Sequence, residues 1–211
     1  MKEIVDQLSA DCDAYVSGEA KHKPFPLYLM GGETPFLKAI ANKADRLGVK
    51  YEFIPYTSDI RRPCIVDVET IKNPFWLTDY ADIDAVDKEN MPSCCSEAIG
   101  DTIKEIGAEG KNITIIGRGH AVQGLAKMLL YCNATVTVAH SKTKNLHEAT
   151  QFADIIVVAA PVTTDQVAPL AGKIVIDVSG TFKGFVDEEL YIGNIGKLTT
   201  SYILWRAVEA M

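Results

Sequence analysis

The chain has 211 residues and a formal net charge of −7, from 21 lysines and arginines against 28 aspartates and glutamates. Nucleic-acid binding depends on clustered cations, and the longest cationic run here is Arg61-Arg62, so we expect no nucleic-acid partner. Hydrophobic residues make up 47% and charged residues 23% of the chain. This composition excludes a disordered protein and predicts a globular one, with one large domain or two lobes.

Membrane, secretion and metal signals are weak. No apolar run approaches the ~18 residues that span a bilayer, and the first residues lack the pattern of a signal peptide, so we expect a cytoplasmic protein without membrane contact. The five cysteines form no Cys-x-x-Cys, which predicts neither a disulfide framework nor a metal site. The vicinal Cys94-Cys95 could be redox-active, although two thiols that open a helix are the plainer interpretation.

Helical periodicity and short β-branched runs alternate along the chain, which is typical of an α/β fold. The first half predicts a helix ending near Gly18, a strand over 26–30, a helix over 37–47 closed by Gly48, strands over 51–54 and 64–68, an irregular acidic stretch over 73–90, and a helix from Ser93 or Ser96 to Gly107. The second half predicts strands over 111–116, 135–138, 154–159 and 173–178, with helices over 121–131, 145–152, 164–170 and 198–210.

Parallel strands require helical crossovers, so the second half predicts a parallel sheet covered on both faces. The expected organisation is two lobes joined by long helices. They are a small α/β lobe over 1–92, a linking helix over 93–109, a Rossmann-like lobe over 110–197 and a C-terminal helix over 198–211 that packs back across the lobes.

A glycine turn, Gly117-Arg118-Gly119, follows the first strand of the second half. Backbone N–H groups and the positive end of a helix dipole meet there, so the turn predicts a dinucleotide site. The spacing is imperfect, because the third glycine of G-x-G-x-x-G falls at Val122 and the nearest glycine is Gly124. A tight turn without a ligand is the alternative.

The end of the next strand favours NADP over NAD. NAD-binding proteins place a carboxylate there, about 20 residues beyond the first glycine, to bind the ribose hydroxyls. This chain has Ala139-His-Ser-Lys-Thr-Lys144, which contains no acid and two lysines, Lys142 and Lys144. These lysines, with Arg118, would suit a 2′-phosphate. Alternatively, the two lysines are only a solvated helix start.

These residues resemble the bifunctional methylenetetrahydrofolate dehydrogenase/cyclohydrolase (FolD-type) family. The stretch 117–122 (GRGHAV) is similar to the family's G-R-S-x-x-V turn, and 133–146 (NATVTVAHSKTKNL) to its N-A-T-V-T-x-x-H-S-x-T-x-N-L segment. The match continues through 153–159 and 176–178, and 195–199 (IGKLT) is similar to the family's V-G-P-M-T. Upstream, 82–85 (DIDA) resembles the D-V-D-G motif that faces the pterin.

The resemblance implies NADP-linked oxidation of 5,10-methylenetetrahydrofolate to the methenyl form, followed by hydrolysis to 10-formyltetrahydrofolate, usually in a homodimer. The first lobe is then the folate-type substrate lobe. The implied cofactor residues are Gly117, Arg118, Gly119, His120, Val122, His140, Ser141, Lys142 and Thr143. The implied substrate residues are Asp82, Asp84, Gly196 and Thr199, with Asp84 as the pterin anchor. A solvated acidic loop is the alternative for the two aspartates, and Asp177 is interpreted as a loop or cap residue.

The chain departs from the family in its first lobe. A family helix carries Tyr-x-x-x-Lys, whose lysine is central to hydrolysis, and alignment back from Gly48 places Phe36 and Ile40 at those positions. The nearest amine, Lys38, is rotated by about 200° from the expected place, so it is only a weak catalytic candidate. The family's Q-L-P-L-P segment is absent, and the chain is shorter than is usual for the family.

Hydride transfer needs a substrate and cofactor that are oriented and shielded from water, and no protein nucleophile. Hydrolysis of the methenyl bridge needs a side chain that transfers protons to or from the water and the ring nitrogen. The sequence therefore predicts a methylenetetrahydrofolate dehydrogenase with doubtful cyclohydrolase activity. Two alternatives remain open: a nucleotide-binding pseudoenzyme, and a Rossmann dehydrogenase with a non-folate substrate.

Overall fold

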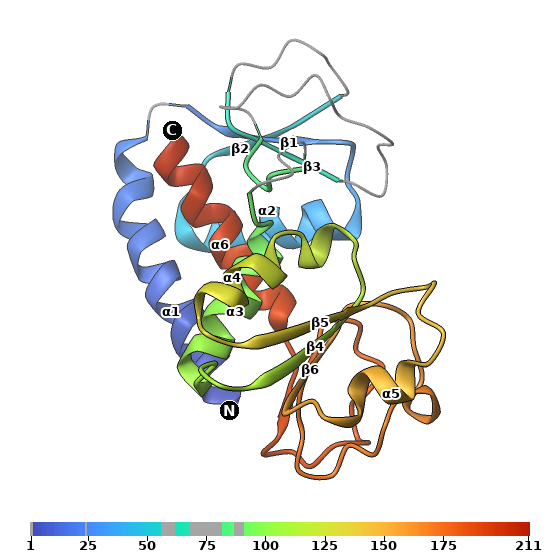
Figure 1. Cartoon of the computed structure of the whole chain (residues 1–211). Coiled ribbons are helices and arrows are strands. Elements are labelled where there is room, and N and C mark those ends of the chain that lie inside the picture. Colours follow the sequence, from blue (N-terminus) through green and yellow to red (C-terminus); the bar gives the residue numbers. More distant parts are fainter. Residues whose placement is uncertain (1, 24, 56–61, 68–81, 87–90) are drawn as a thin grey trace.

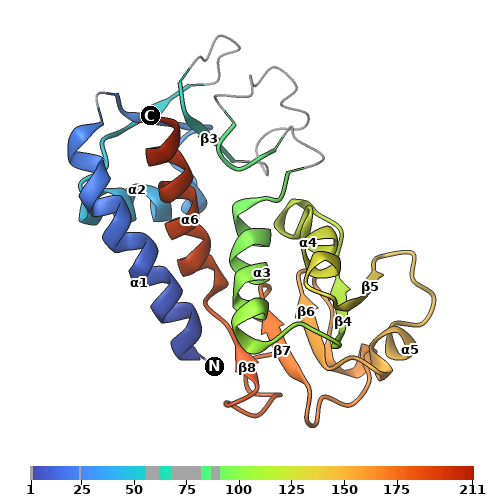
Figure 2. The same ribbon diagram turned by 60° about the vertical axis from the view of Figure 1, so that its left-hand side comes forward.

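The structure is a computed structural model that describes residues 2–23, 25–55, 62–67, 82–86 and 91–211. Two parallel sheets lie at opposite ends of the molecule, with helices α1, α3 and α6 running between them (Figures 1 and 2). The α/β class predicted from the sequence is confirmed. Within the described part, no helix is both long and apolar enough to cross a bilayer.

The smaller sheet has the order β2-β1-β3, with β1 (Leu27–Met30) central between β2 (Tyr51–Ile54) and β3 (Cys64–Val66). Helix α2 (Pro35–Leu47) makes the crossover from β1 to β2. The Thr34 hydroxyl accepts a hydrogen bond from the Leu37 N–H, 3.3 Å away, and caps the start of α2. The helix ends at Gly48, which adopts the left-handed conformation at φ 74°.

The larger sheet has the order β5-β4-β6-β7-β8. Its strands are β4 (Asn112–Ile116), β5 (Thr135–Ala139), β6 (Ile155–Val158), β7 (Ile174–Asp177) and β8 (Tyr191–Ile192). All four residues of β6 are buried, and alternate residues of the strand belong to two different apolar clusters. Both faces of the sheet are therefore covered, as the continuous apolar run predicts.

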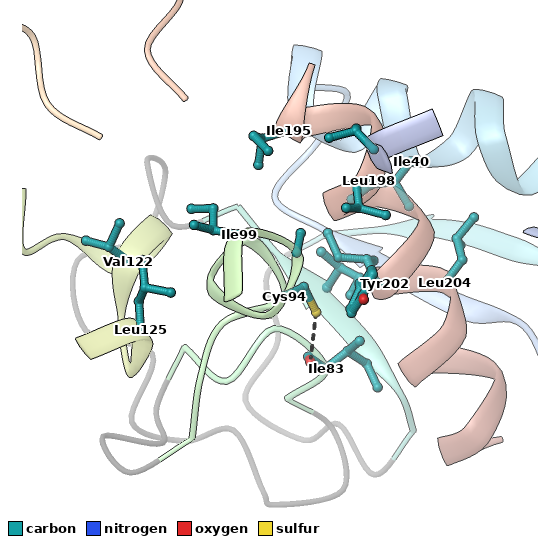
Figure 3. Packing of buried hydrophobic residues seen from close by; sticks show 14 of the residues in the cluster. Ile40, Ile83, Cys94, Ile99, Val122, Leu125, Ile195, Leu198, Tyr202 and Leu204 are labelled. Atoms are coloured by element: carbon teal, nitrogen blue, oxygen red, sulfur yellow. Dashed lines mark hydrogen bonds between the residues drawn. The ribbon is translucent and has the colours of Figure 1, made fainter. Parts of the chain in front are cut away.

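Helices α1 (Lys2–Glu19), α3 (Cys94–Ile106) and α6 (Ile195–Ala210) pack against one another between the sheets. Figure 3 shows part of this core, in which Ile99 lies on the side of α3 toward Val122 and Leu125, and Leu198 of α6 lies near Ile40 of α2. Ser93 caps α3 by accepting from the Ser96 N–H at 3.1 Å, so the first of the two predicted caps is the one used.

Two predicted helices are wrong in extent. The helix expected over 121–131 is a short 3₁₀ turn, η2 (His120–Val122), followed by α4 (Leu125–Tyr131). The break falls at Gly124, whose φ is 79° and where a Cβ would lie 2.9 Å from the Pro92 Cα. The helix expected over 164–170 is only the 3₁₀ turn η3 (Thr164–Gln166), because the next residue, Val167, is already extended.

Other differences are smaller. Strand β8 was not predicted, because two residues give no periodicity to read. Helix α6 begins three residues before the predicted Leu198, and Asn145 caps α5 (Leu146–Gln151). A 3₁₀ turn, η1 (Ala20–His22), extends α1. Most of the acidic stretch predicted over 73–90 lies outside the described residues, which include only 82–86 of it.

Candidate functional site

The glycine turn follows β4, the strand from which the chain crosses to opposite sides of the larger sheet. From β4 the chain crosses to β5 on one side and later to β6 on the other, so the carboxyl end of β4 is the topological switch point at which such sheets bind ligands. A cavity of about 440 Å³ opens there. Its lining comes from the turn after β4 (117–119), the loop after β5 (140, 141 and 143) and the segment after β6 (159–162).

The backbone of the turn is suited to a bound pyrophosphate. Gly117 has φ 131°, and a Cβ there would lie 3.0 Å from the Ala159 carbonyl oxygen, so a larger residue would push the turn away from β6. At Gly119 a Cβ would meet nothing within 4 Å, which leaves the backbone open to a ligand. These features fit the close approach that a dinucleotide requires.

Of the three cations in the sequence argument, Arg118 lines this cavity, whereas Lys142 and Lys144 are not among its lining residues. No carboxylate is found among its described lining residues, and Arg118 is the cation among them. The backbone N–H of His140 donates to the Thr143 hydroxyl at 2.9 Å, and the backbone N–H of Lys142 donates to the ring atom Nδ1 of His140 at 3.2 Å. The Nε2 atom of a neutral His140 therefore carries the proton and can donate to an anion.

A second cavity, of about 650 Å³, lies between the two lobes. The first lobe contributes the start of α2 (34–36), Asp67 after β3, and Asp84. Helix α3 contributes Cys95, and the remaining lining comes from 120–121, Val178 and the first turns of α6. The cavity is thus apolar over much of its wall and contains two carboxylates.

Asp84 is held from two sides. Its Oδ1 accepts from the Cys94 N–H at the start of α3 (2.8 Å), and its Oδ2 lies 3.0 Å from His120 Nε2. Burial lowers the pKa of His120, but the hydrogen bond and charge of Asp84 and a hydrogen bond to Gln123 outweigh burial and raise that pKa. Only 7% of the Asp84 side chain is exposed, so this is a buried, ordered carboxylate rather than a solvated loop residue.

The segment 82–86 is fixed by its surroundings. Asp82 accepts from the Val86 N–H at 2.9 Å and is not among the residues that line the cavity. Arg206 of α6 donates to the Ile83 carbonyl (3.1 Å) and the Pro92 carbonyl (2.8 Å), while pairing with Glu97 of α3 at 2.7 Å. Sequence reasoning missed this arginine, and its signal is a cation that follows the apolar run 202–205 of α6.

The structure shows where the residues at the family's Tyr-x-x-x-Lys positions lie, and where the nearest lysine lies. Phe36 lines the second cavity, while Ile40 is fully buried in the core. Lys38 is 55% exposed and pairs with Glu33 at 3.2 Å, away from the cavity lining. Among the described residues that line this cavity there is no lysine.

The predicted binding residues divide between the two cavities. Lining the first are Gly117, Arg118, Gly119, His140, Ser141 and Thr143, whereas Lys142 is not among its lining residues. Lining the second are Asp84, Gly196 and Thr199. Two residues predicted for the cofactor lie elsewhere: His120 lines the second cavity, and Val122 is buried in the core.

Asp67 was not predicted as a site residue, although an acid at the carboxyl end of an apolar parallel strand is a recognisable signal. Asp177 is a loop-fixing residue, because its carboxylate accepts from the Gly180 and Phe182 N–H groups at 2.7 and 2.8 Å. Burial raises the pKa of the Cys95 thiol to about 11 and that of Cys94 further. Both thiols therefore stay protonated near neutral pH, which argues against a reactive pair.

The chain is similar in sequence to known proteins. Residues 93–195 match the model of the tetrahydrofolate dehydrogenase/cyclohydrolase NAD(P)-binding domain. The chain is 37% identical over 138 residues to the bifunctional protein FolD of Clostridium beijerinckii, covering 56% of this chain and 49% of that protein. It is 32% identical over 184 residues to FolD of Dictyoglomus turgidum, covering 72% and 65%.

A solved FolD methylenetetrahydrofolate dehydrogenase/cyclohydrolase from Campylobacter jejuni has the same fold, with a TM-score of 0.72, 23% identity, and coverage of 98% of this chain and 96% of that one. The chain spans about half the length of the first curated relatives that it matches. The match to the domain model falls on the linking helix and the NAD(P)-binding lobe. Residues 93–195 therefore resemble the NAD(P)-binding domain of the tetrahydrofolate dehydrogenase/cyclohydrolase (FolD-type) family.

Proposed function

We propose that the chain oxidises 5,10-methylenetetrahydrofolate to 5,10-methenyltetrahydrofolate, with NADP as the hydride acceptor. The observation that carries the proposal is the position of two cavities on either side of one glycine turn. Residues 117–119 line the first cavity, and the next two residues, His120 and Ala121, line the second. A dinucleotide in one cavity and a folate in the other would thus meet at this turn.

On the cofactor side, the open backbone at Gly119 would approach the pyrophosphate, and Arg118 would bind a 2′-phosphate. When bound, NADP supplies the hydride acceptor. The absence of a carboxylate among the described lining residues favours NADP over NAD, because nothing there would repel the phosphate or bind the free ribose hydroxyls.

On the substrate side, the Asp84 carboxylate would accept hydrogen bonds from the aminopyrimidine edge of the pterin. Loss of a hydride from the methylene bridge leaves a cation on the substrate. Asp67 and Asp84 both line the cavity, and carboxylates in a poorly hydrated site favour a developing positive charge. The chain's task in this step is therefore orientation, desolvation and electrostatic stabilisation.

The hydrolytic step is expected to be slow. The family's Tyr/Lys positions hold Phe36, which has no proton to give, and Ile40, which is buried away from the cavity. Lys38 pairs with Glu33 on the surface and does not replace them. We therefore expect methenyl product to accumulate rather than to be converted promptly to the 10-formyl form.

One assay tests these statements together. The protein is mixed with 5,10-methylenetetrahydrofolate and NADP, and reduced cofactor and methenyl product are followed separately. Equal amounts of both, with slow decay of the methenyl absorbance, support the proposal. Binding of NADP without any reduction above background would instead identify a nucleotide-binding pseudoenzyme.

The Asp84→Asn variant gives a sharper test of the substrate. Losing a charge-assisted hydrogen bond of about 1.5–3 kcal/mol should raise KM for the folate at least tenfold while leaving the Kd for NADP unchanged. Glu52→Gln, an exposed acid on β2, is the matched control. An unchanged KM for the folate in Asp84→Asn would contradict the role of Asp84 as the pterin anchor.

We also propose a homodimer. Strand β5 is at the edge of the larger sheet, and its Val138 is 44% exposed; Leu130 and Tyr131 of the neighbouring α4 are 60% and 80% exposed. An exposed apolar edge strand readily pairs with another copy. Light scattering should report twice the chain mass, and Val138→Lys should lower it to the monomer mass; a monomeric wild-type chain contradicts the proposal.

A further inference from the structure

His120 follows the cofactor turn directly in sequence, yet its side chain belongs to the substrate cavity. Its Nε2 lies 3.0 Å from Asp84 Oδ2 and its Nδ1 lies 3.4 Å from Gln123 Oε1. The imidazole is 20% exposed and lines the same cavity as Asp84. Both of its nitrogens therefore face oxygen atoms, in a partly buried site.

The orientation of Gln123 is set independently of the histidine. Its Nε2 donates to the Ala85 carbonyl at 2.8 Å and to the Met91 carbonyl at 3.0 Å. Carbonyl oxygens can only accept, so the amide nitrogen must face them and the amide oxygen must face His120. The Nδ1 atom of His120 therefore has to donate a proton to Gln123.

The other nitrogen faces a carboxylate. A neutral imidazole has a single N–H, so either Nε2 would present a lone pair to Asp84 or Nδ1 would present one to Gln123. In either tautomer, a nitrogen lone pair of His120 faces an oxygen lone pair, and the two atoms repel each other. Only the imidazolium, with a proton on both nitrogens, satisfies both contacts.

We propose, building on the folate ligand proposed above, that His120 is a positioning residue, held as an imidazolium that fixes the Asp84 carboxylate for the substrate. The Cys94 N–H holds Oδ1 and His120 holds Oδ2, so the plane of the carboxylate is set before the ligand arrives. The lone pairs that remain on the carboxylate can then accept from the ligand. Because His120 follows Gly119, the turn that would bind the cofactor also orients the substrate anchor.

The charged and titratable groups around His120 favour this state. Asp84 contacts it, Asp82 on the same segment adds to the negative potential, and the carboxylate of Asp67 and the thiol of Cys95 line the same cavity. Loss of one proton from His120 would turn one of its two hydrogen bonds into a repulsive contact. The position of Asp84, and with it the affinity for a folate, should then weaken as pH rises.

The protonation state can be read without any ligand. Long-range ¹H–¹⁵N NMR spectra of the full chain should show both His120 nitrogens protonated at pH 7, with the signals assigned by their loss in His120→Gln. His147, which is exposed on α5, gives a second imidazole signal in the same spectra and serves as the internal reference. A neutral His120 at pH 7 overturns the proposal.

The positioning role is tested by the pH dependence of binding, with 5-formyltetrahydrofolate as a stable probe. In the wild-type chain the Kd should rise about tenfold between pH 6 and 9, the loss of about one charge-assisted hydrogen bond. His120→Gln should bind about tenfold more weakly at pH 6 and show a nearly flat profile, and His147→Gln should behave as wild type. A profile that stays the same in His120→Gln overturns the positioning role.

The two measurements separate this inference from the proposed function. If the wild-type chain binds no folate at any pH, the folate function fails and the positioning role fails with it, while the NMR spectra still decide whether His120 is an imidazolium. If folate binds but His120 is neutral, the folate function stands and the inference fails. His120→Asn, a shorter side chain that cannot reach both partners, is the second variant if His120→Gln does not fold.

Discussion

Arg118 is the residue on which cofactor choice should depend. It is the cation that lines the first cavity, and it follows Gly117 in the turn. Arg118→Gln should weaken NADP binding about 10- to 100-fold, the loss of charge-assisted hydrogen bonds worth roughly 1.5–3 kcal/mol, while changing NAD affinity little. Calorimetric titration of both dinucleotides checks this.

Lys111→Gln is the matched control for Arg118→Gln, because Lys111 lies just before β4, at the end of the strand opposite to the cavity. An equal loss of NADP and NAD affinity in Arg118→Gln would mean that the arginine binds the shared pyrophosphate. In that case the preference for a 2′-phosphate would have to come from the loop that contains Lys142.

His120 should also make folding stability depend on pH. Its pKa in the folded chain is raised above the usual value of about 6.5, so its stabilising contribution is fully present below pH 6.5 and is lost as pH rises through the folded pKa. In urea unfolding, the wild-type chain should exceed His120→Gln in stability by more at pH 5.5 than at pH 9. A difference that grows with pH would contradict the raised pKa.

At the residue scale, the sequence indicated which residues could bind ligands, but not which side chains contact one another in the fold. The turn glycines line the first cavity and Asp84 lines the second. The pairing of His120 with Asp84 was not predictable, because the two are 36 positions apart and meet only when the lobes pack. Motif similarity placed His120 with the cofactor, since a motif gives the position of a residue along the chain but not the direction of its side chain.

At the element scale, helix α2 carries two lysines with opposite surroundings. The Lys43 side chain is 4% exposed and pairs with Asp13 of α1 at 3.0 Å. It also donates to Ser9 of α1 and to Ser201 and the Lys197 carbonyl of α6, so one amine joins three helices. Burial lowers the pKa of Lys43 more than Asp13 raises it, which is the expected cost of a charge in this position.

Removing this amine should loosen the three-helix junction. Lys43→Met should lower the free energy of unfolding by about 2–3 kcal/mol, less than the ~3–5 kcal/mol of a fully buried pair, because 26% of the Asp13 side chain is exposed. Asp13→Asn added to Lys43→Met should recover part of the loss, since the uncompensated carboxylate is then gone. Urea denaturation measures both.

Lys38→Met is the control on the same helix. Its exposed pair with Glu33 should contribute no more than about 0.5 kcal/mol. Equal effects of the two lysine variants would contradict the role given to Lys43. The sequence could not distinguish these lysines, because burial of Lys43 depends on α1 and α6, which are far away along the chain.

The elements that the sequence predicted well have strong local signals. Helix α2 has a Thr34 cap, a proline in its first turn and a Gly48 end, and β6 is a continuous apolar run. The errors fall where contacts with distant parts of the chain determine where a helix begins or ends. The start of α4 is delayed because Gly124 packs against the Pro92 backbone, which no pattern within 121–131 could show.

At the scale of the whole molecule, the two lobes share one core. A single apolar cluster includes Leu29 of the first sheet, Ile99 of α3, Ile115 of the second sheet and Leu204 of α6. Helix α6 packs against α1 and α2 of the first lobe and against the linking helix α3. The predicted lobe boundaries therefore describe where ligands would bind rather than where the core is interrupted.

A shared core predicts one cooperative unfolding transition and a shift of the whole transition by the cofactor. NADP at about 100 times its Kd should stabilise the native state by about 2.7 kcal/mol, which for a chain of this size raises Tm by about 5–10 °C. Far-UV circular dichroism and tryptophan fluorescence should report the same shift, because Trp205 lies on α6 while the proposed cofactor residues lie in the second lobe. Two transitions, of which NADP moves only one, would show that the lobes unfold separately and that α6 does not couple them.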